Sequence, residues 1–225
     1  MNWISLDRLL EQTPEARPVA LEPLLEHAEL RQQALRLAGG LRSRKITQLA
    51  VHLEDAGELA IALLGAWRAG ATVLLPADLQ PANRQRLAAQ AELWLTDQEG
   101  DSHLQELLGE ALPAAPLDLD QCRLLLCTSG SSGEPKLIEK RLRQLTNEAE
   151  VLEAQWGADL AGASIIGSVA AQHIYGLLFR VIWPLCAGRP VLRRALPFPE
   201  DIQLASRKQA SFCLVASPAL LKRMG

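Results

Sequence analysis

The sequence has little of what marks secreted, membrane-spanning or nucleic-acid-binding proteins. It holds four cysteines in 225 residues with no Cys-x-x-Cys pair, and three lie in apolar runs, where a free thiol behaves as a small hydrophobe. Its apolar stretches are interrupted short of the roughly 20 residues that a membrane helix needs. Its net charge of −3 mixes 23 basic with 26 acidic residues and leaves no basic stripe. We therefore expect reduced thiols, a cytoplasmic location, no membrane span and no nucleic acid partner.

The residues that are present indicate a globular α/β protein. Hydrophobic residues make up 48% of the chain and charged residues 22%, enough to bury a sizeable core. Periodicity predicts strands at 49–53, 71–75, 93–96, 123–128, 164–170 and 212–215, and helices near 26–43, 57–69, 83–91, 102–108, 141–156, 200–208 and from 217 onward. Such alternation is typical of layered, mostly parallel sheets covered by helices.

The segment 124–136 is the most informative, because a buried strand runs into a glycine loop that ends in a cation. Gly130 and Gly133 allow consecutive backbone N–H groups to turn inward and form an anion nest. Lys136 adds positive charge after Pro135. Hydroxyl donors around the nest come from Thr128, Ser129, Ser131 and Ser132. Composition alone favours a flexible surface loop, but the strand before it and the Pro-Lys after it favour a site for a nucleotide triphosphate tail.

The spacing excludes two common nucleotide motifs. A Walker loop would require glycine at position 135, which is proline, and no G-x-G-x-x-G follows a predicted strand. The loop serines also lack the G-x-S-x-G setting of a nucleophile elbow. We assign no catalytic residue and no metal ligand, since His27, His52 and His103 have no acidic partner at ligand spacing.

A second candidate site lies at residues 171–177, where Ala-Gln-His-Ile-Tyr-Gly-Leu follows a predicted strand and opens an apolar segment. His173 and Tyr175, the only tyrosine, would lie at the end of the sheet, where ligands bind in open α/β folds. A histidine that merely begins a helix explains His173 equally well on these residues alone.

Residues 128–136, Thr-Ser-Gly-Ser-Ser-Gly-Glu-Pro-Lys, resemble the phosphate loop of the adenylate-forming superfamily of acyl-CoA synthetases, aryl-acid ligases and peptide-synthetase adenylation domains. Residues 28–41 resemble its early helix and 63–78 its Ala-Gly-Ala element, so the resemblance spans nearly the whole chain. It implies that residues 1–225 form the N-terminal portion of the ligase large domain, with possible sublayers 1–116 and 117–225. One departure is Leu137, since the family usually has glycine after the lysine.

The resemblance implies ATP-dependent activation of an aryl or fatty acid to an acyl-adenylate, with Mg²⁺, and transfer to coenzyme A or an acyl carrier protein. The loop would hold the β and γ phosphates, while His173 and Tyr175 shape the acyl side and Gly176 gives backbone clearance. Residues 172–190 also resemble the carrier-protein-loading ligases of aryl-polyene pigment pathways.

Several elements of the family are missing from this sequence, and two competing hypotheses stay open. The family's adenine-side segment, ribose-binding aspartate and mobile C-terminal domain with its catalytic lysine have no counterpart here, so we expect the isolated chain to be inactive. A non-catalytic nucleotide- or acyl-binding module is one competing hypothesis. A small-molecule kinase is another, and it would produce ADP instead of AMP.

Overall fold

Two five-stranded sheets form the framework of the computed structural model, which describes residues 3–12, 14, 16–128 and 136–224. Sheet A has the order β10-β8-β9-β1-β2 and sheet B the order β5-β3-β4-β6-β7. Neighbouring strands are parallel except at β2 and β7, which run antiparallel at one edge of each sheet. The expected α/β fold with mostly parallel sheets is confirmed.

Sheet B comes from the middle of the chain. Its strands are β3 (Gln48–His52), β4 (Thr72–Leu75), β5 (Leu93–Thr96), β6 (Arg123–Thr128) and β7 (Lys136–Arg141). The first four match the predicted strands to within a residue, and β7 follows the glycine loop. The candidate boundary near residue 116 lies between β5 and β6, which both belong to this sheet.

Sheet A combines the two ends of the chain. Its strands are β1 (Pro18–Leu21), β2 (Leu25–Glu26), β8 (Ser164–Gly167), β9 (Val191–Leu192) and β10 (Phe212–Val215). Strands β1, β2 and β9 are not among the predicted strands, and β8 ends three residues before its predicted end. Strand β1 pairs with β9, so residues near position 20 lie beside residues near 191.

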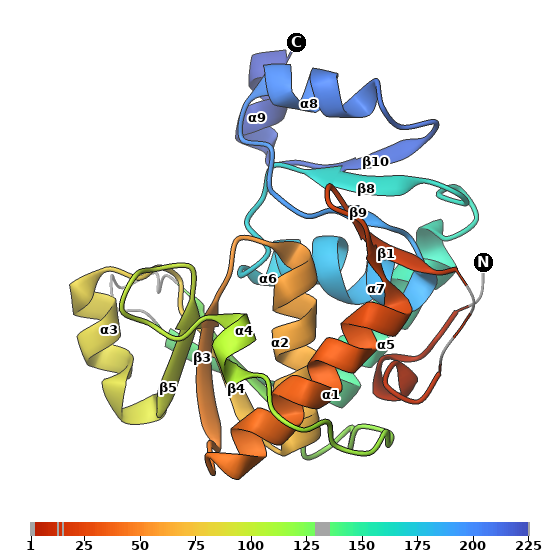
Figure 1. Cartoon of the computed structure of the whole chain (residues 1–225). Coiled ribbons are helices and arrows are strands. Elements are labelled where there is room, and N and C mark those ends of the chain that lie inside the picture. Colours follow the sequence, from red (N-terminus) through yellow and green to blue (C-terminus); the bar gives the residue numbers. More distant parts are fainter. Residues whose placement is uncertain (1–2, 13, 15, 129–135, 225) are drawn as a thin grey trace.

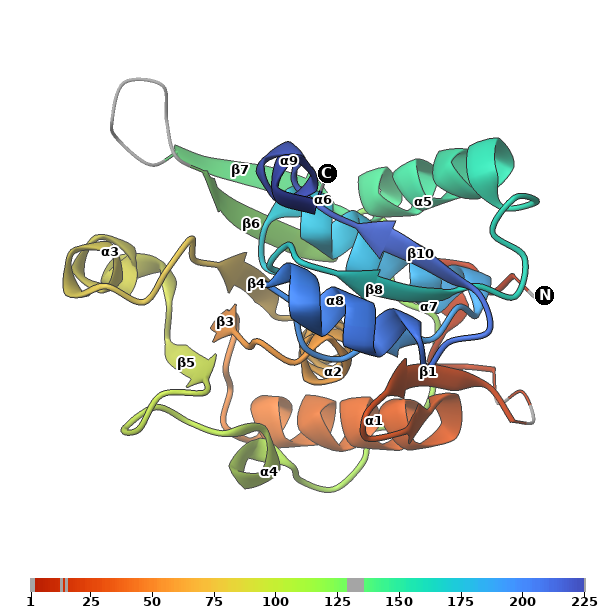
Figure 2. The same cartoon turned by 90° about the horizontal axis from the view of Figure 1, so that it is seen from above.

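Helices cover both sheets (Figures 1 and 2). The longer ones are α1 (His27–Ser43), α2 (Ala56–Ala69), α5 (Leu142–Trp156), α8 (Pro199–Ser206), α9 (Pro218–Met224) and α3 (Pro81–Leu87). The shorter ones are η1 (Leu6–Arg8), η2 (Ala88–Gln90), α4 (Leu104–Leu107), α6 (Ile174–Leu177), the π-helical turn η3 (Leu178–Ile182) and α7 (Trp183–Ala187). Helices α8 and α9 lie on the outer face of sheet A.

Helix α2 lies between the two sheets and joins them. It contacts β3 and β4 of sheet B as well as β1 and β9 of sheet A. Its apolar residues are buried on every side, which explains why they show no single hydrophobic stripe. Asp55 caps its N-terminus by accepting from the backbone N–H groups of Gly57 and Glu58, and Gly70 ends it in the left-handed conformation.

Helix α1 packs against α2 and approaches the 107–112 segment very closely. A Cβ atom added to Gly39 would lie 1.7 Å from the carbonyl oxygen of Glu110. One added to Gly40 would lie 1.7 Å from the carbonyl oxygen of Leu107. Glycine occupies these positions near the C-terminal end of α1 because the neighbouring backbone takes the space of a side chain.

All four cysteines are free, and three of them are buried. Burial raises the pKa of the Cys122 thiol to about 11, so this thiol is neutral at physiological pH. No helix in the described part of the chain is long and apolar enough to cross a bilayer.

Candidate functional site

The hairpin formed by β6 and β7 carries the predicted phosphate loop at its tip. Thr128 ends β6, Lys136 begins β7, and the two residues pair across the antiparallel ladder. The Thr128 hydroxyl donates to the Lys136 carbonyl oxygen at 3.3 Å, and Lys136 is exposed. The remaining predicted loop residues, Ser129, Gly130, Ser131, Ser132 and Gly133, lie outside the described residues. The structure thus fixes both ends of the loop, and its phosphate-binding role stays a prediction.

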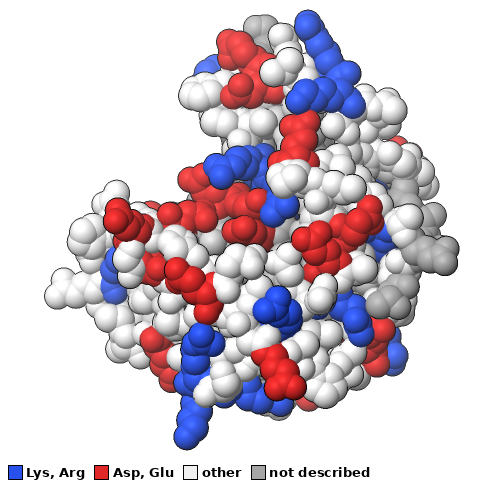
Figure 3. Space-filling model, in the orientation of Figure 1, with Lys and Arg blue, Asp and Glu red and all other residues white. Residues whose placement is uncertain are grey.

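The loop leaves sheet B at the edge where its parallel strands end. Strands β3, β4 and β5 end at this same edge because they run parallel to β6 or to its neighbours. Acidic side chains gather here and along the adjoining hollow, which Figure 3 shows as red atoms between the upper and lower parts of the molecule. Those beside His52 are Asp97, Glu54 and Asp78.

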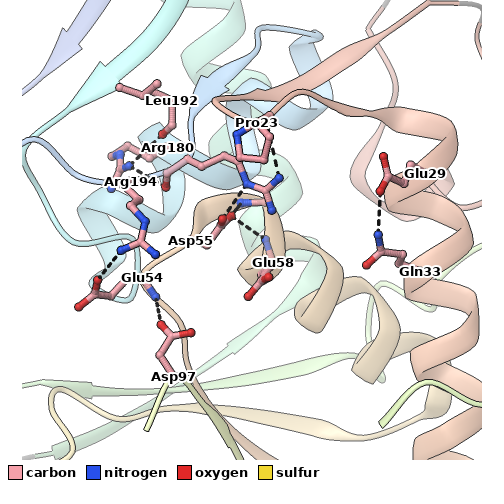
Figure 4. Close-up of polar contacts among 12 residues, drawn as sticks. Pro23, Glu29, Gln33, Glu54, Asp55, Glu58, Asp97, Arg180, Leu192 and Arg194 are labelled. Carbon is pink, nitrogen blue, oxygen red and sulfur yellow. Dashed lines mark hydrogen bonds and ion pairs between the residues drawn. The ribbon is translucent and has the colours of Figure 1, made fainter. Parts of the chain in front are cut away.

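Burial shifts the pKa values of two groups at this edge in opposite directions. It lowers the pKa of His52, because the charged imidazolium loses solvent, although the neighbouring carboxylates partly offset this effect. It raises the pKa of Glu58, and the negative charge of Asp55 adds to that rise. The cations Arg193 and Arg194 oppose it, and Figure 4 shows Arg194 beside Glu54. No group of three or more potential metal ligands forms among the described residues, so they offer no preformed Mg²⁺ site.

Arg180 fixes the segment that leads from β8 to His173. Its side chain is only 1% exposed and donates to the carbonyl oxygens of Val169 at 2.7 Å and Leu192 at 3.1 Å. Burial lowers its pKa to about 10, so it remains charged at neutral pH. Gln172 adds a second anchor by donating to the Leu53 carbonyl oxygen below sheet A. Arg180 interrupts an apolar run of the sequence, and no local pattern indicated this positioning role.

His173 and Tyr175 are exposed at the start of α6, next to this anchored segment. The His173 backbone caps α6, since its carbonyl oxygen accepts from Leu177 at 2.7 Å. A Cβ atom on the buried Gly176 would lie 2.0 Å from the Ala170 carbonyl oxygen. Gly176 therefore provides clearance for the chain's own backbone, and its predicted place beside a substrate stays a prediction.

An apolar groove of about 310 Å³ opens beside Tyr175, between α5 and η3. The Tyr175 and Phe179 rings are 4.8 Å apart, and Phe179 packs edge-on against Trp183 at 5.8 Å. The groove is lined by Asn147, Glu148, Val151, Leu152, Leu178 and Phe179. The groove was not predicted from the sequence. Val151, an exposed apolar residue outside the spacing of the buried residues of α5, was the signal that could have indicated it.

Solved structures with the same fold include two CoA synthetases. The chain superposes on a Brucella canis acyl-CoA synthetase with a TM-score of 0.79 and 21% identity, covering 99% of this chain and 49% of that one. It superposes on the Bacillus subtilis o-succinylbenzoate CoA synthetase MenE, bound to its acyl-adenylate intermediate, with a TM-score of 0.78, 20% identity and 96% coverage of this chain. Another MenE structure contains ATP and a magnesium ion.

Two curated proteins match in sequence. A 4-coumarate–CoA ligase of Rhodobacter capsulatus is 33% identical over 99 residues, which are 44% of this chain and 25% of that ligase. The antimetabolite synthetase AmbB of Pseudomonas aeruginosa is 27% identical over 197 residues, which are 74% of this chain and 16% of AmbB. The resemblance to the adenylate-forming ligases is confirmed. No protein-family model matches the chain.

The fold is that of the N-terminal part of an adenylate-forming ligase. The chain spans about half the length of the acyl-CoA synthetase and a quarter or less of the two curated relatives. The substrates and products of the complete ligases are therefore carried over to this chain only as a proposal.

Proposed function

We propose that this chain takes part in the ATP-dependent activation of a carboxylic acid to an acyl-adenylate. The loop 128–136 holds the β and γ phosphates of ATP, and the apolar groove receives the aryl or aliphatic part of the acid. One structural relation carries this proposal, namely that α5, which forms one wall of the groove, begins directly where the β6–β7 hairpin ends. An ion pair of 2.8 Å between Lys140 of β7 and Glu148 of α5 ties the two together.

The proposed chemistry needs positioning and charge stabilisation rather than a catalytic side chain from these residues. A carboxylate oxygen attacks the α-phosphorus, the bond to the bridging oxygen breaks, and pyrophosphate leaves. Backbone N–H groups of the loop and Lys136 stabilise charge on the leaving group. Mg²⁺, when bound with ATP, neutralises further phosphate charge. His173 and Tyr175 orient the acid. The thiol of coenzyme A or an acyl carrier protein then attacks the acyl carbon, the bond from that carbon to the phosphate oxygen breaks, and AMP leaves as the thioester forms.

The lining of the groove favours an acid with an apolar body. Val151 is 66% exposed and Phe179 belongs to a cluster of tilted and edge-on aromatic rings, so a planar or aliphatic chain would cover surface that now faces water. Burying such surface gains about 25 cal/mol per Å². Aryl acids of the kind used by the aryl-polyene ligases fit this groove, as do fatty acids. A non-catalytic module that only binds nucleotide and acyl groups would use the same two features.

The decisive experiment measures AMP and pyrophosphate formed from ATP with a panel of aryl and fatty acids. The product of the gene's natural open reading frame is assayed beside the 225-residue chain, and Lys136→Ala, Gly130→Ala and Val151→Glu are introduced into whichever form is active. We expect both loop variants to lower kcat at least about tenfold, because each removes stabilisation of the pyrophosphate charge. Val151→Glu should raise KM for apolar acids about tenfold.

Matched controls separate these effects from general damage. Lys208→Ala removes an exposed lysine that belongs to neither the loop nor the groove, and Glu150→Gln removes a charge from another face of α5. Both should leave the kinetics unchanged. If neither form produces AMP with any of the acids, the ligase proposal is excluded and the binding module remains. If ADP forms in place of AMP, the protein is a kinase.

A further inference from the structure

A second polar hollow lies at the opposite edge of sheet B, away from the phosphate loop. It has a volume of about 290 Å³ and is enclosed by the C-terminal ends of α1 and α2, the first residues of β4 and β6, and the 116–122 segment. Arg123 begins β6 and Thr128 ends it, so the two edges are separated by roughly 17 Å along the strand. In Figure 1 this edge faces the bottom of the view, while α8 and α9 lie at the top.

Three guanidinium groups line this hollow against a single carboxylate. Arg42, Arg68 and Arg123 contribute the positive charge, and Asp118 the negative charge. One oxygen of Asp118 already accepts the backbone N–H groups of Asp120 and Gln121, at 2.9 and 3.0 Å. The remaining polar groups, Thr72 and Gln121, are neutral. The hollow therefore carries an excess of positive charge.

Two of these arginines are free to bind a ligand. Within the described residues, the side chains of Arg42 and Arg123 form no hydrogen bond and no ion pair. Arg68 uses its Nε and one terminal nitrogen to donate to the Pro113 carbonyl oxygen at 3.1 and 2.7 Å, which leaves its other terminal nitrogen free. Arg123 also lies opposite Arg141 across the β6–β7 ladder, and like charges in that position repel each other.

Helix dipoles explain only part of this arrangement. Arg42 and Arg68 lie in the last turns of α1 and α2, where a cation interacts favourably with the carbonyl groups of the helix end. Arg123 starts a β-strand and has no such reason to be there. An anion that bridges it to Arg42 would relieve the repulsion and satisfy the planar donor forks of both side chains.

We propose that Arg42, Arg68 and Arg123 form a binding site for a small phosphate-bearing anion, separate from the loop at 128–136. The hollow is large enough for inorganic phosphate, pyrophosphate or the phosphate group of a nucleoside monophosphate, and its donors match the tetrahedral oxygens of such a group. This site does not depend on the proposed ligase function, because it shares no residue with the loop or the groove.

Isothermal titration calorimetry of the purified chain at pH 8 tests the proposal, with inorganic phosphate, pyrophosphate and AMP as titrants. We expect Arg42→Gln and Arg123→Gln each to weaken binding at this site at least about tenfold, as the loss of a charge-assisted hydrogen bond predicts. Arg123→Lys should weaken it less, because the charge is kept and only the fork is lost. Both residues are exposed, so circular dichroism should show the unchanged fold.

Two further variants keep the result specific. Arg207→Gln removes an equal charge from the exposed end of α8, and Lys136→Ala affects the phosphate loop. Neither should change the arginine site. The proposal would be overturned if anion binding stayed unchanged in both Arg42→Gln and Arg123→Gln, or if it weakened equally in Arg207→Gln. It would also be overturned if binding were lost only in Lys136→Ala, or if none of the titrants bound to the unaltered chain.

Discussion

His27 is the most deeply buried of the four histidines, with 1% of its surface exposed. Its Nε2 lies 2.9 Å from the Leu9 carbonyl oxygen, and its Nδ1 has no partner among the described residues. Burial lowers its pKa below the ordinary 6.5, the Leu9 carbonyl opposes that shift, and the nearby Arg17 and Arg31 add to it. The folded protein therefore holds this side chain neutral.

This burial predicts a loss of stability on the acid side. Because the folded state resists protonation of His27, the unfolded chain binds more protons below pH 6.5, so stability is fully present above that pH and falls as the pH drops toward the lowered value. Urea unfolding at pH 8 and pH 5.5 measures the fall. We expect the loss of unfolding free energy between pH 8 and pH 5.5 to be smaller in His27→Gln, whose side chain can keep the hydrogen bond to Leu9.

The exposed His103 provides the control for this measurement. His103→Gln should leave the fall unchanged, whereas His52, whose pKa is also lowered by burial, accounts for part of the fall that remains in the His27 variant. If the free energy of unfolding fell equally with pH in His27→Gln and in the unaltered chain, burial of neutral His27 would not be the cause of the fall.

At this scale the sequence predicted residue types better than residue environments. Thr128 and Lys136 could be placed at the ends of a loop because strand periodicity and glycine spacing are local properties. The anchoring role of Arg180 could not be predicted, because its acceptors belong to Val169 and to Leu192 of a different strand. The groove likewise depends on Phe179 meeting Leu152 across two helices that the sequence separates.

Helix α1 contains two consecutive glycines, Gly39 and Gly40, although glycine has a low intrinsic helix propensity. Alanine in place of a mid-helix glycine normally stabilises a helix by about 1 kcal/mol. At Gly40 a methyl group would overlap the Leu107 carbonyl oxygen, so the backbone of the 107–112 segment would have to move. We therefore expect Gly40→Ala to destabilise the chain by roughly 2 kcal/mol or more, measured by urea unfolding.

Gln32→Ala is the matched control for this change, because Gln32 is exposed on the same helix. It should alter the free energy of unfolding by less than about 0.5 kcal/mol. If Gly40→Ala were as stable as the unaltered chain, the backbone of the 107–112 segment would be able to move away from the added methyl group with little loss of unfolding free energy.

Element boundaries followed from the sequence where periodicity was long and failed where elements were short. Helices α1 and α5 begin and end within a residue or so of the expected positions, since each repeats its apolar stripe over several turns. Strands β1 and β2 have four and two residues and depend on partners rather than on pattern. The apolar segment 173–187 divides into α6, η3 and α7, with Pro184 near the start of α7.

At the scale of the whole molecule, two ion pairs among the described residues join the end of sheet B to sheet A, and Arg193 forms the less exposed one. Arg193 follows β9, and its Nε lies 2.7 Å from Oδ2 of Asp55, with both side chains under 20% exposed. The Arg193 carbonyl oxygen also accepts from the backbone N–H of Ala56 at 2.9 Å. Asp55 thus holds the N-terminus of α2 and the other sheet at the same time.

A double-mutant cycle separates these two roles. Asp55→Ser can keep the helix cap but removes the ion pair, and Arg193→Met keeps the apolar stem but removes the charge. We expect a coupling energy of about 1–3 kcal/mol from urea unfolding, because the pair is largely shielded from water. The exposed pair Arg194–Glu54, at 3.4 Å, should give less than about 1 kcal/mol. A coupling energy near zero for Arg193 and Asp55 would show that this ion pair does not join the sheets energetically.

The strand order of sheet A also constrains how the chain can assemble during synthesis. Sheet B uses residues 48–141 and can form as soon as that stretch has left the ribosome. Strand β1, at residues 18–21, must wait for β9 at 191–192, which at about 5–20 residues per second takes roughly ten seconds or more. During that interval the hydrogen-bonding edge of β1 that β9 will occupy stays unpaired, so a holding chaperone would find its target at residues 18–21 rather than at the newest end of the nascent chain.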